Sequence, residues 1–315
     1  MNNKTEYINQ RIAYGNTLVE LGKTNPNIVV LDADLGASTM GSLFEAEFPN
    51  RHFEIGIAEA NMISISAGLA LTGKIPFANS FAVFASGRTY DQIRQSVAIP
   101  HLNVKIVGSS AGLSDFGDGA THQMVEDIAI MRALPNMTII SPADANETVE
   151  AVKAIAEYNG PVYLRLGRTD YPNVTESGKP FKIGEPTVLK DGSDIAIFAT
   201  GYMVSVALEA AKELEGKISV KVINISTIKP LDSQKIVDLT KNCKAVLCAE
   251  EHNVMGGLGS AILEVMSLNP KPTELFGIKD TYGRSAQSYE ELLGYMGLTK
   301  ESMVKAIEFL NGEFK

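Results

Sequence analysis

The sequence contains no tryptophan, two cysteines and four histidines among its 315 residues. Cys243 and Cys248 are too few to build a disulfide framework, and no His or Cys cluster with metal-ligand spacing lies near them. This scarcity excludes a small disulfide-stapled fold and a cysteine-based metal site. We expect both thiols to be ordinary core or surface groups.

Positive charge is also scarce. Lys and Arg total 28 against 37 Asp and Glu, which gives a net charge of −9. General binding to nucleic acid or to a membrane surface needs a basic face and is excluded, whereas a local basic pocket for a small phosphorylated substrate is compatible with this balance. No apolar run is long enough to span a bilayer, and residues 1–10 lack the apolar core of a signal peptide. We therefore expect a cytoplasmic protein.

The composition, 45% hydrophobic and 21% charged, is that of a globular protein long enough for about two domains. Short apolar segments, such as residues 28–31, alternate with helical patterns, which predicts parallel β-sheets covered by helices on both faces. Residues 169–194 interrupt this alternation with prolines, glycines and polar residues. We predict two doubly wound α/β domains: residues 1–175 with a mostly parallel sheet, a linker at 176–189, and a smaller domain at 190–315.

The segment from Arg51 to Phe84 is the most informative stretch of the chain. A strand-like run ends near Ile57, and a single carboxylate, Glu59, then opens a stretch that is apolar on nearly all sides and ends at Gly73. This pattern predicts a buried central helix with an ionisable group in its first turn. On these residues alone, Glu59 is either a functional acid or a carboxylate that interacts favourably with the helix dipole.

Other candidates lie in loops that follow predicted strands, where open parallel sheets bind ligands. They are Asp32, Asp34, Ser38, Phe81, Phe84, Asp118, His122, Arg165 and Arg168. Asp118 shortly precedes His122, so its carboxylate is in reach to set the tautomer of the imidazole. Arg165 and Arg168 have the fork geometry that binds a phosphate or carboxylate. The residues themselves leave the ordinary alternatives open: a capping histidine, solvated arginines and core phenylalanines.

Several segments together carry a family resemblance. They are FEIGIAEANM (53–62), NSFAVF (79–84), DGATHQ (118–123), PADANE (142–147), RLGR (165–168) and CAEEHN (248–253). Any one of them alone would be a weak indication. Their combination, within a similarity that covers roughly residues 7–310, resembles the C-terminal half of a transketolase, specifically the small subunit of a split transketolase encoded as two chains.

The resemblance implies thiamine diphosphate as the cofactor. Glu59 resembles the catalytic carboxylate that hydrogen-bonds N1′ of the aminopyrimidine ring and thereby favours the imino tautomer of its 4′-amino group. Phe81 and Phe84 resemble the aromatic residues that pack on this ring, and Asp34 resembles an acid near the thiazolium. These four residues are the cofactor-binding residues that the resemblance implies.

The resemblance also implies a set of substrate-binding residues. Asp118 resembles a residue that hydrogen-bonds a hydroxyl of the ketose donor. His122 resembles a catalytic histidine that contacts substrate hydroxyls and, with Ser38, the sugar phosphate. Arg11 and Arg168 resemble two arginines that clamp the phosphate group.

The sequence departs from complete family members in two respects. Ser110 stands where many members have a histidine; a hydroxyl can donate one hydrogen bond but supplies no cation, which affects phosphate affinity and sugar preference. The glycine–aspartate motif that binds the diphosphate and its divalent metal is missing. We therefore expect Mg or Ca to be bound mainly by an N-terminal partner subunit, in an α2β2 assembly. The isolated chain should be inactive and prone to homodimerise.

The predicted function is transfer of a two-carbon ketol unit between a ketose phosphate and an aldose phosphate, as in the pentose phosphate pathway. Two related enzymes are alternatives. The run RTYDQ (88–92) resembles 1-deoxyxylulose-5-phosphate synthase, and the overall layout resembles the β subunit of 2-oxoacid dehydrogenase E1. A non-catalytic structural or regulatory subunit is an alternative of another class, against which the presence of Glu59, Asp118 and His122 argues.

Overall fold

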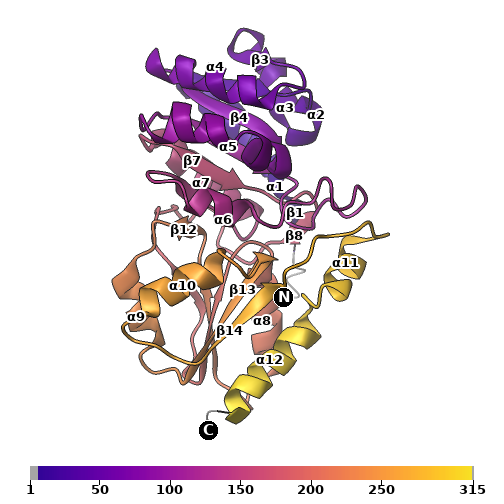
Figure 1. Ribbon diagram of the computed structural model, residues 1–315, viewed down its shortest axis with the longest axis vertical. Coiled ribbons are helices and arrows are strands. Elements are labelled where there is room, and N and C mark those ends of the chain that lie inside the picture. The colour runs from indigo at the N-terminus through magenta and orange to yellow at the C-terminus, as the bar shows by residue number, and fades with distance from the viewer. Residues whose placement is uncertain (1–5, 314–315) are drawn as a thin grey trace.

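The computed structural model describes residues 6–313 (Figure 1). Each half of the chain builds its own sheet with helices on both faces, so the predicted α/β fold with a mostly parallel sheet in the first half is confirmed. The two sheets lie one above the other in Figure 1, with the N-terminal half at the top.

The N-terminal sheet has seven strands. In spatial order they are β12 (Thr227–Lys229), β6 (Thr138–Ile140), β7 (Val162–Arg165), β5 (Lys105–Ser109), β4 (Ile75–Phe81), β2 (Ile28–Asp32) and β3 (His52–Glu54). All neighbours are parallel except the β12–β6 pair. Every residue of β2 and β5 is buried, as expected for parallel strands covered on both faces.

Helices cover both faces of this sheet. One face packs against α1 (Gln10–Thr24), α3 (Gly41–Glu47) and α7 (Ala145–Glu157), through residues such as Tyr14 and Phe44. The other face packs against α4 (Glu59–Leu71), η3 (Ile93–Ala98) and α6 (Asp127–Arg132). Short helical segments fill the connections: α2 (Gly36–Thr39), η1 (Pro49–Arg51), η2 (Val83–Arg88) and α5 (Tyr90–Gln92).

Helix α4 begins at Glu59 as expected, but the prediction that it is buried on nearly all sides is wrong. Met62, Ile63 and Ala67 face the core, whereas Asn61 and Leu71 are exposed. The Leu71 side chain is 73% exposed, and Ile57 just before the helix is 76% exposed. The exposed side of α4 thus carries Asn61, Ser64 and Gly68, with apolar Leu71 at its far end, and Ile57 is the exposed apolar residue near the Glu59 end.

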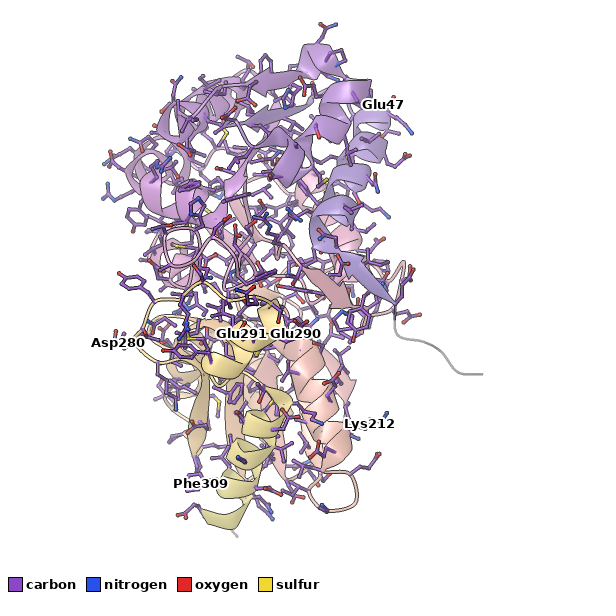
Figure 2. The ribbon with its side chains drawn as sticks, turned by 90° about the vertical axis from the view of Figure 1, so that its right-hand side faces the viewer. Glu47, Lys212, Asp280, Glu290, Glu291 and Phe309 are labelled. Atoms are coloured by element: carbon purple, nitrogen blue, oxygen red, sulfur yellow. The ribbon has the colours of Figure 1, made fainter. Side chains whose placement is uncertain are left out.

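The C-terminal sheet is smaller. Its strands, in spatial order, are β14 (Thr273–Ile278), β13 (Ala245–Asn253), β10 (Ile195–Ala199), β11 (Val220–Asn224) and the antiparallel edge strand β9 (Thr187–Lys190). The helices that cover its two faces are α8 (Met203–Glu213), α11 (Tyr289–Tyr295) and α12 (Lys300–Glu313) on one side, and α9 (Ser233–Thr240) and α10 (Leu258–Met266) on the other. Cys243 and Cys248 are free thiols in the core of this half. Figure 2 shows Lys212 on α8 and Phe309 on α12 at the outer surface.

The two halves are joined by more than the chain connection. Strand β12 comes from the C-terminal half and extends the N-terminal sheet. Half-buried Glu147 of α7 accepts hydrogen bonds from Asn224, at the end of β11, and from Ser226 just beyond it. The proline- and glycine-containing segment of residues 169–194 carries strand β8 (Asp170–Pro172), which pairs antiparallel with β1 (Tyr7–Asn9). This pairing brings residues 7–9 next to the segment that follows β7.

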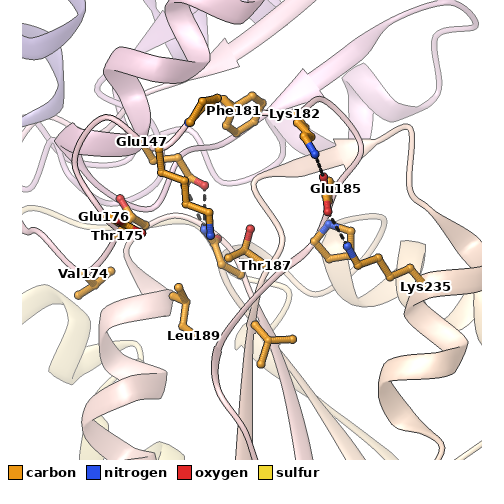
Figure 3. Close-up of a pocket in the computed structure, with 15 residues that line it drawn as sticks. Glu147, Val174, Thr175, Glu176, Phe181, Lys182, Glu185, Thr187, Leu189 and Lys235 are labelled. Carbon is orange, nitrogen blue, oxygen red and sulfur yellow. Dashed lines mark hydrogen bonds and ion pairs between the residues drawn. The ribbon is translucent and has the colours of Figure 1, made fainter.

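A cavity of about 560 Å³ lies where the segment of residues 174–189 passes between the halves (Figure 3). Glu147 and Asn224 line it together with Lys182, Glu185 and Lys235, and Glu185 pairs with both lysines. The lining contains none of the predicted site residues. Across residues 6–313, no helix combines the length and the apolar character that crossing a membrane requires.

Candidate active site

Glu59 is held by one arginine. Its carboxylate is 3% exposed and lies at the first residue of α4, at the carboxyl-end edge of the parallel strands. Nη1 of Arg88 donates to both carboxylate oxygens, at 2.7 Å and 2.8 Å. A buried carboxylate needs such a charged or hydrogen-bonding partner, because desolvation of an unpaired charge is costly. The Arg88 side chain itself is 48% exposed.

Phe81 and Phe84 form a stacked pair beside this carboxylate. Their ring centroids are 6.3 Å apart and the ring planes differ by 14°. Phe81 ends strand β4 and is buried, whereas Phe84 lies in the π-helical turn η2 and is half-buried. The guanidinium carbon of Arg88 lies 4.3 Å from the Phe84 ring centroid, so Arg88 links Glu59 to the aromatic pair.

His122 meets both phenylalanines edge-on, with centroid distances of 6.4 Å to Phe81 and 5.5 Å to Phe84. Its Nδ1 atom hydrogen-bonds the hydroxyl of Thr121 at 3.0 Å. The expectation that Asp118 orients this imidazole is wrong, because the Asp118 carboxylate points to Arg168, with 3.6 Å between Oδ2 and Nη1. The structure therefore brings His122, Phe81 and Phe84 together and places Asp118 on the arginine side.

Arg168 is the centre of a charged cluster. Its Nη1 donates to Asp115 at 2.8 Å, and its guanidinium carbon lies 5.7 Å from the Phe81 ring centroid. Burial raises the pKa of the Asp115 carboxyl, and the Arg168 cation opposes this shift. Asp118 adds a second, half-exposed carboxylate. Sequence reasoning missed Asp115, although it lies in the same loop between β5 and α6 as Asp118 and His122.

Arg11 lies on the other side of Arg168. Its guanidinium donates to the backbone carbonyls of Ser38, at 2.8 Å, and of Arg168, at 3.0 Å. Burial and the nearby Arg168 cation lower the pKa of Arg11 below its ordinary value. The β1–β8 pairing explains this arrangement, since it joins the start of α1 to the segment after β7. Two cations and the segment of Ser38 therefore line one side of the candidate site.

Asp32 and Asp34 lie in different environments, although only Ala33 separates them in the sequence. Asp34 is exposed, has a left-handed backbone with φ of 60°, and donates its N–H to Glu54 Oε1 at 2.8 Å. Asp32 is fully buried and accepts a hydrogen bond from Thr39, with His52 at 2.9 Å on its other oxygen. Asp32 thus fixes the loop after β2, whereas Asp34 lies on its exposed part.

Arg165 is not available for a ligand, contrary to our expectation. It is buried, and its Nε pairs with Asp127 at 2.9 Å, while Nη2 donates to the backbone carbonyl of Glu251 at 3.0 Å. Burial alone disfavours the guanidinium charge, but Asp127 and Glu251 raise the pKa of Arg165 above its ordinary value. Arg165 belongs to the junction between the halves of the molecule.

Ser110 combines two unusual properties. It is a non-glycine residue with a left-handed backbone, at φ of 54°, and it is fully buried. Its hydroxyl oxygen has no hydrogen-bond partner among the described residues. Such strain and such an orphaned polar atom concentrate at functional sites.

Two sequence profiles match most of the chain. The profile of the transketolase pyrimidine-binding domain matches residues 6–174, and that of the transketolase C-terminal domain matches residues 184–303. The chain belongs to the transketolase family. The predicted family resemblance is therefore confirmed.

Individual transketolase relatives agree with this assignment. A Methanocaldococcus jannaschii protein described as a transketolase C-terminal section is 49% identical over 306 residues, which is 96% of each chain. A Clostridium protein, a subunit of a 6-deoxy-6-sulfo-D-fructose transketolase, is 41% identical over 298 residues, covering 94% of this chain and 92% of that protein. Among solved structures, a split-gene transketolase in an inactive β4 tetramer matches with a TM-score of 0.89 and 46% identity, covering 98% of this chain and 100% of that chain.

Within this transketolase chain, sequence reasoning missed Arg88 as a partner of Glu59. The two residues are far apart in sequence, and a lone exposed arginine carries no pattern of its own. One indication was available: Arg88 follows Phe84 at a spacing that places both side chains on one face of a helix. The π-helical winding of η2 has no sequence pattern of its own and was not predictable.

Proposed function

We propose that this chain is the small subunit of a transketolase that transfers a two-carbon ketol unit between a ketose phosphate and an aldose phosphate, using thiamine diphosphate. The observation that carries the proposal is the buried Glu59 carboxylate beside the Phe81–Phe84 pair. A planar cation, the Arg88 guanidinium, already lies between the carboxylate and the Phe84 ring, so this place accommodates a flat ring that donates to Glu59. When bound, thiamine diphosphate supplies a nucleophilic carbon and an electron sink for cleaving a carbon–carbon bond next to a carbonyl.

The residues of this chain then have distinct tasks. Glu59 holds a proton shared with N1′ of the pyrimidine ring, and Phe81 and Phe84 pack on that ring. His122, edge-on to both phenylalanines, contacts the hydroxyls of the substrate and exchanges protons with them. Asp34 lies toward the thiazolium end of the cofactor.

The charged cluster on the other side binds the substrate. Arg168 and Arg11 attract the phosphate group, supported by Ser38. Asp118, which is half-exposed next to Arg168, hydrogen-bonds a hydroxyl of the ketose. Ser110 gives one neutral hydrogen bond where a histidine would add a cation.

A partner subunit completes the site. The exposed apolar side chains of Phe53 and Ile57, just before the Glu59 end of α4, support docking of an N-terminal subunit that binds the diphosphate and its Mg or Ca ion. We propose an α2β2 assembly that acts on cytoplasmic pentose phosphates.

The test is ketol transfer from xylulose 5-phosphate to ribose 5-phosphate, measured with this chain, with its candidate N-terminal subunit, and with both. We expect turnover only in the mixture, lost with Glu59→Gln and retained with Glu47→Gln, the same chemical change at an exposed site on α3 (Figure 2). A parallel assay with a sulfonated ketose decides between phosphate and sulfonate donors.

The alternatives give different outcomes in the same assay. Turnover of pyruvate in place of ketose phosphates would favour a synthase or a 2-oxoacid dehydrogenase subunit. If the mixture turned over none of the donors, this chain would be a non-catalytic subunit and the proposal would be overturned.

A further inference from the structure

Arg88 makes two contacts that a bound aminopyrimidine ring would also need. Nη1 donates to both oxygens of Glu59, at 2.7 Å and 2.8 Å, and the guanidinium carbon lies 4.3 Å from the Phe84 centroid. The guanidinium is planar, cationic and a hydrogen-bond donor only. A pyrimidine ring with a proton on N1′ is also planar and donates to the same carboxylate, so the two groups compete for one acceptor and one aromatic surface.

We propose that Arg88 is a displaceable occupant of the pyrimidine site: it pairs with Glu59 while the cofactor is absent and swings out when the cofactor binds. This inference rests on the proposed function. In the cofactor-free chain, the arginine keeps the buried carboxylate paired and oriented for its later partner.

The difference in exposure between the two partners makes the exchange feasible. The Glu59 side chain is 3% exposed and cannot leave its place, whereas the Arg88 side chain is 48% exposed and can move into water. Water solvates the released Arg88 cation, and the donating pyrimidine ring replaces it as the partner of the buried Glu59 carboxylate, so neither charge is left unpaired. The cofactor can therefore displace Arg88 at a small cost in affinity.

The location of Arg88 supports movement of its side chain alone. Arg88 is the last residue of the π-helical turn η2, and the Thr89 hydroxyl next to it donates to the carbonyl of Ala85 in the buried part of that turn. This hydrogen bond holds the turn at its Arg88 end, so the Arg88 side chain can move without unwinding η2. π-Helical turns of this kind are frequent at functional sites.

The experiment measures the dissociation constant of thiamine diphosphate for the assembled two-subunit enzyme, by titration calorimetry with Mg and without substrate. We expect Arg88→Ala to bind the cofactor about three- to tenfold more tightly than the wild type, because a competitor for Glu59 is removed. Arg88→Lys retains a cation without the planar stacking and should lie between the two. Arg94→Ala, at an exposed arginine in η3, serves as the matched control and should leave the constant unchanged.

Repeating the Arg88→Ala measurement in a Glu59→Gln background tests whether the effect passes through Glu59. In that background, Arg88→Ala should cause little further decrease in the dissociation constant of thiamine diphosphate. Weaker or unchanged binding in Arg88→Ala would overturn the inference, since it would make Arg88 a stacking partner of the bound cofactor or a bystander. If the wild-type enzyme itself binds no thiamine diphosphate, the proposed function fails and the inference fails with it.

Discussion

The backbone N–H of Leu113 donates to Oε1 of Glu251 at 2.5 Å, across the junction between the two halves of the molecule. The other carboxylate oxygen accepts from the Tyr289 hydroxyl at 2.8 Å. Leu113 lies in the loop between β5 and α6 that carries Asp115, Asp118 and His122. A residue of the C-terminal half thus anchors the loop that bears the proposed substrate contacts.

Replacing Glu251 should destabilise the chain strongly. Glu251→Ala leaves the Leu113 N–H and the Tyr289 hydroxyl without their acceptor and removes one of the two carboxylates that stabilise the Arg165 charge, so we expect a loss of about 3–5 kcal/mol in the free energy of unfolding. Glu251→Gln retains one acceptor oxygen and should lose about 1–2 kcal/mol. Urea unfolding measures both.

The control for Glu251 is Glu290→Gln. Glu290 is exposed on α11, close to the same junction (Figure 2), so its replacement should change the free energy of unfolding by less than about 0.5 kcal/mol. Equal stability of Glu251→Ala and this control would show that the junction does not depend on the carboxylate.

Lys105 should make stability depend on pH. Its ammonium group is buried in β5 and donates to the carbonyls of Tyr158 and Gly160, at 2.7 Å and 2.8 Å, and burial lowers the pKa of Lys105 to about 7. Between pH 7 and the ordinary lysine pKa the unfolded chain holds a proton that the folded chain has released, so stability rises with pH in this window.

The matching variant is Lys105→Met. Relative to it, the wild-type free energy of unfolding should rise between pH 7 and 9.5 with a slope of up to about 1.4 kcal/mol per pH unit. Lys212→Met, on the exposed part of α8, should retain the wild-type slope. Parallel pH profiles of wild type and Lys105→Met would contradict a lowered pKa.

Replacing Arg168 should weaken the binding of phosphorylated substrates only. If it binds the phosphate equally in ground and transition states, Arg168→Gln raises KM for the aldose phosphate about 10- to 100-fold with little change in kcat, since charge-assisted hydrogen bonds contribute about 1.5–3 kcal/mol. Turnover of an unphosphorylated aldose should be nearly unchanged, and Lys212→Gln should have no effect on either. An equal loss of activity with both aldoses would instead indicate that Arg168→Gln disrupts the site by breaking the Asp115–Arg168 ion pair.

Two glycines should respond oppositely to a methyl group. A Cβ atom at Gly41 would lie 1.9 Å from Oδ2 of Asp32, so Gly41→Ala should lower the free energy of unfolding by about 2–3 kcal/mol. A Cβ at Gly68, on the exposed side of α4, meets nothing within 4 Å, so Gly68→Ala should raise it by about 0.5–1 kcal/mol. Thermal unfolding of the two variants checks the prediction, and a stabilised Gly41→Ala would contradict the tight packing on Asp32.

The sequence predicts the parts of this molecule that depend on local pattern. Short apolar runs at residues 28–31, 75–80, 104–107 and 195–199 predict β2, β4, β5 and β10 to within two residues at each end, because buried parallel strands leave a continuous hydrophobic run. Strands β1, β8, β9 and β12 were missed, since each is only three or four residues long and is stabilised by pairing with a distant segment. No local pattern encodes such pairing.

The same division applies to the candidate site. The residue types, their order and the family resemblance follow from the chain alone, and so does the expectation that Glu59 opens a helix at the ligand-binding edge of a parallel sheet. Tertiary structure decided the partners of these residues: Arg88 rather than a backbone donor for Glu59, Thr121 rather than Asp118 for His122, and Asp127 rather than a ligand for Arg165. Partner choice depends on which charged groups share a desolvated space, and that is fixed only when distant segments pack together.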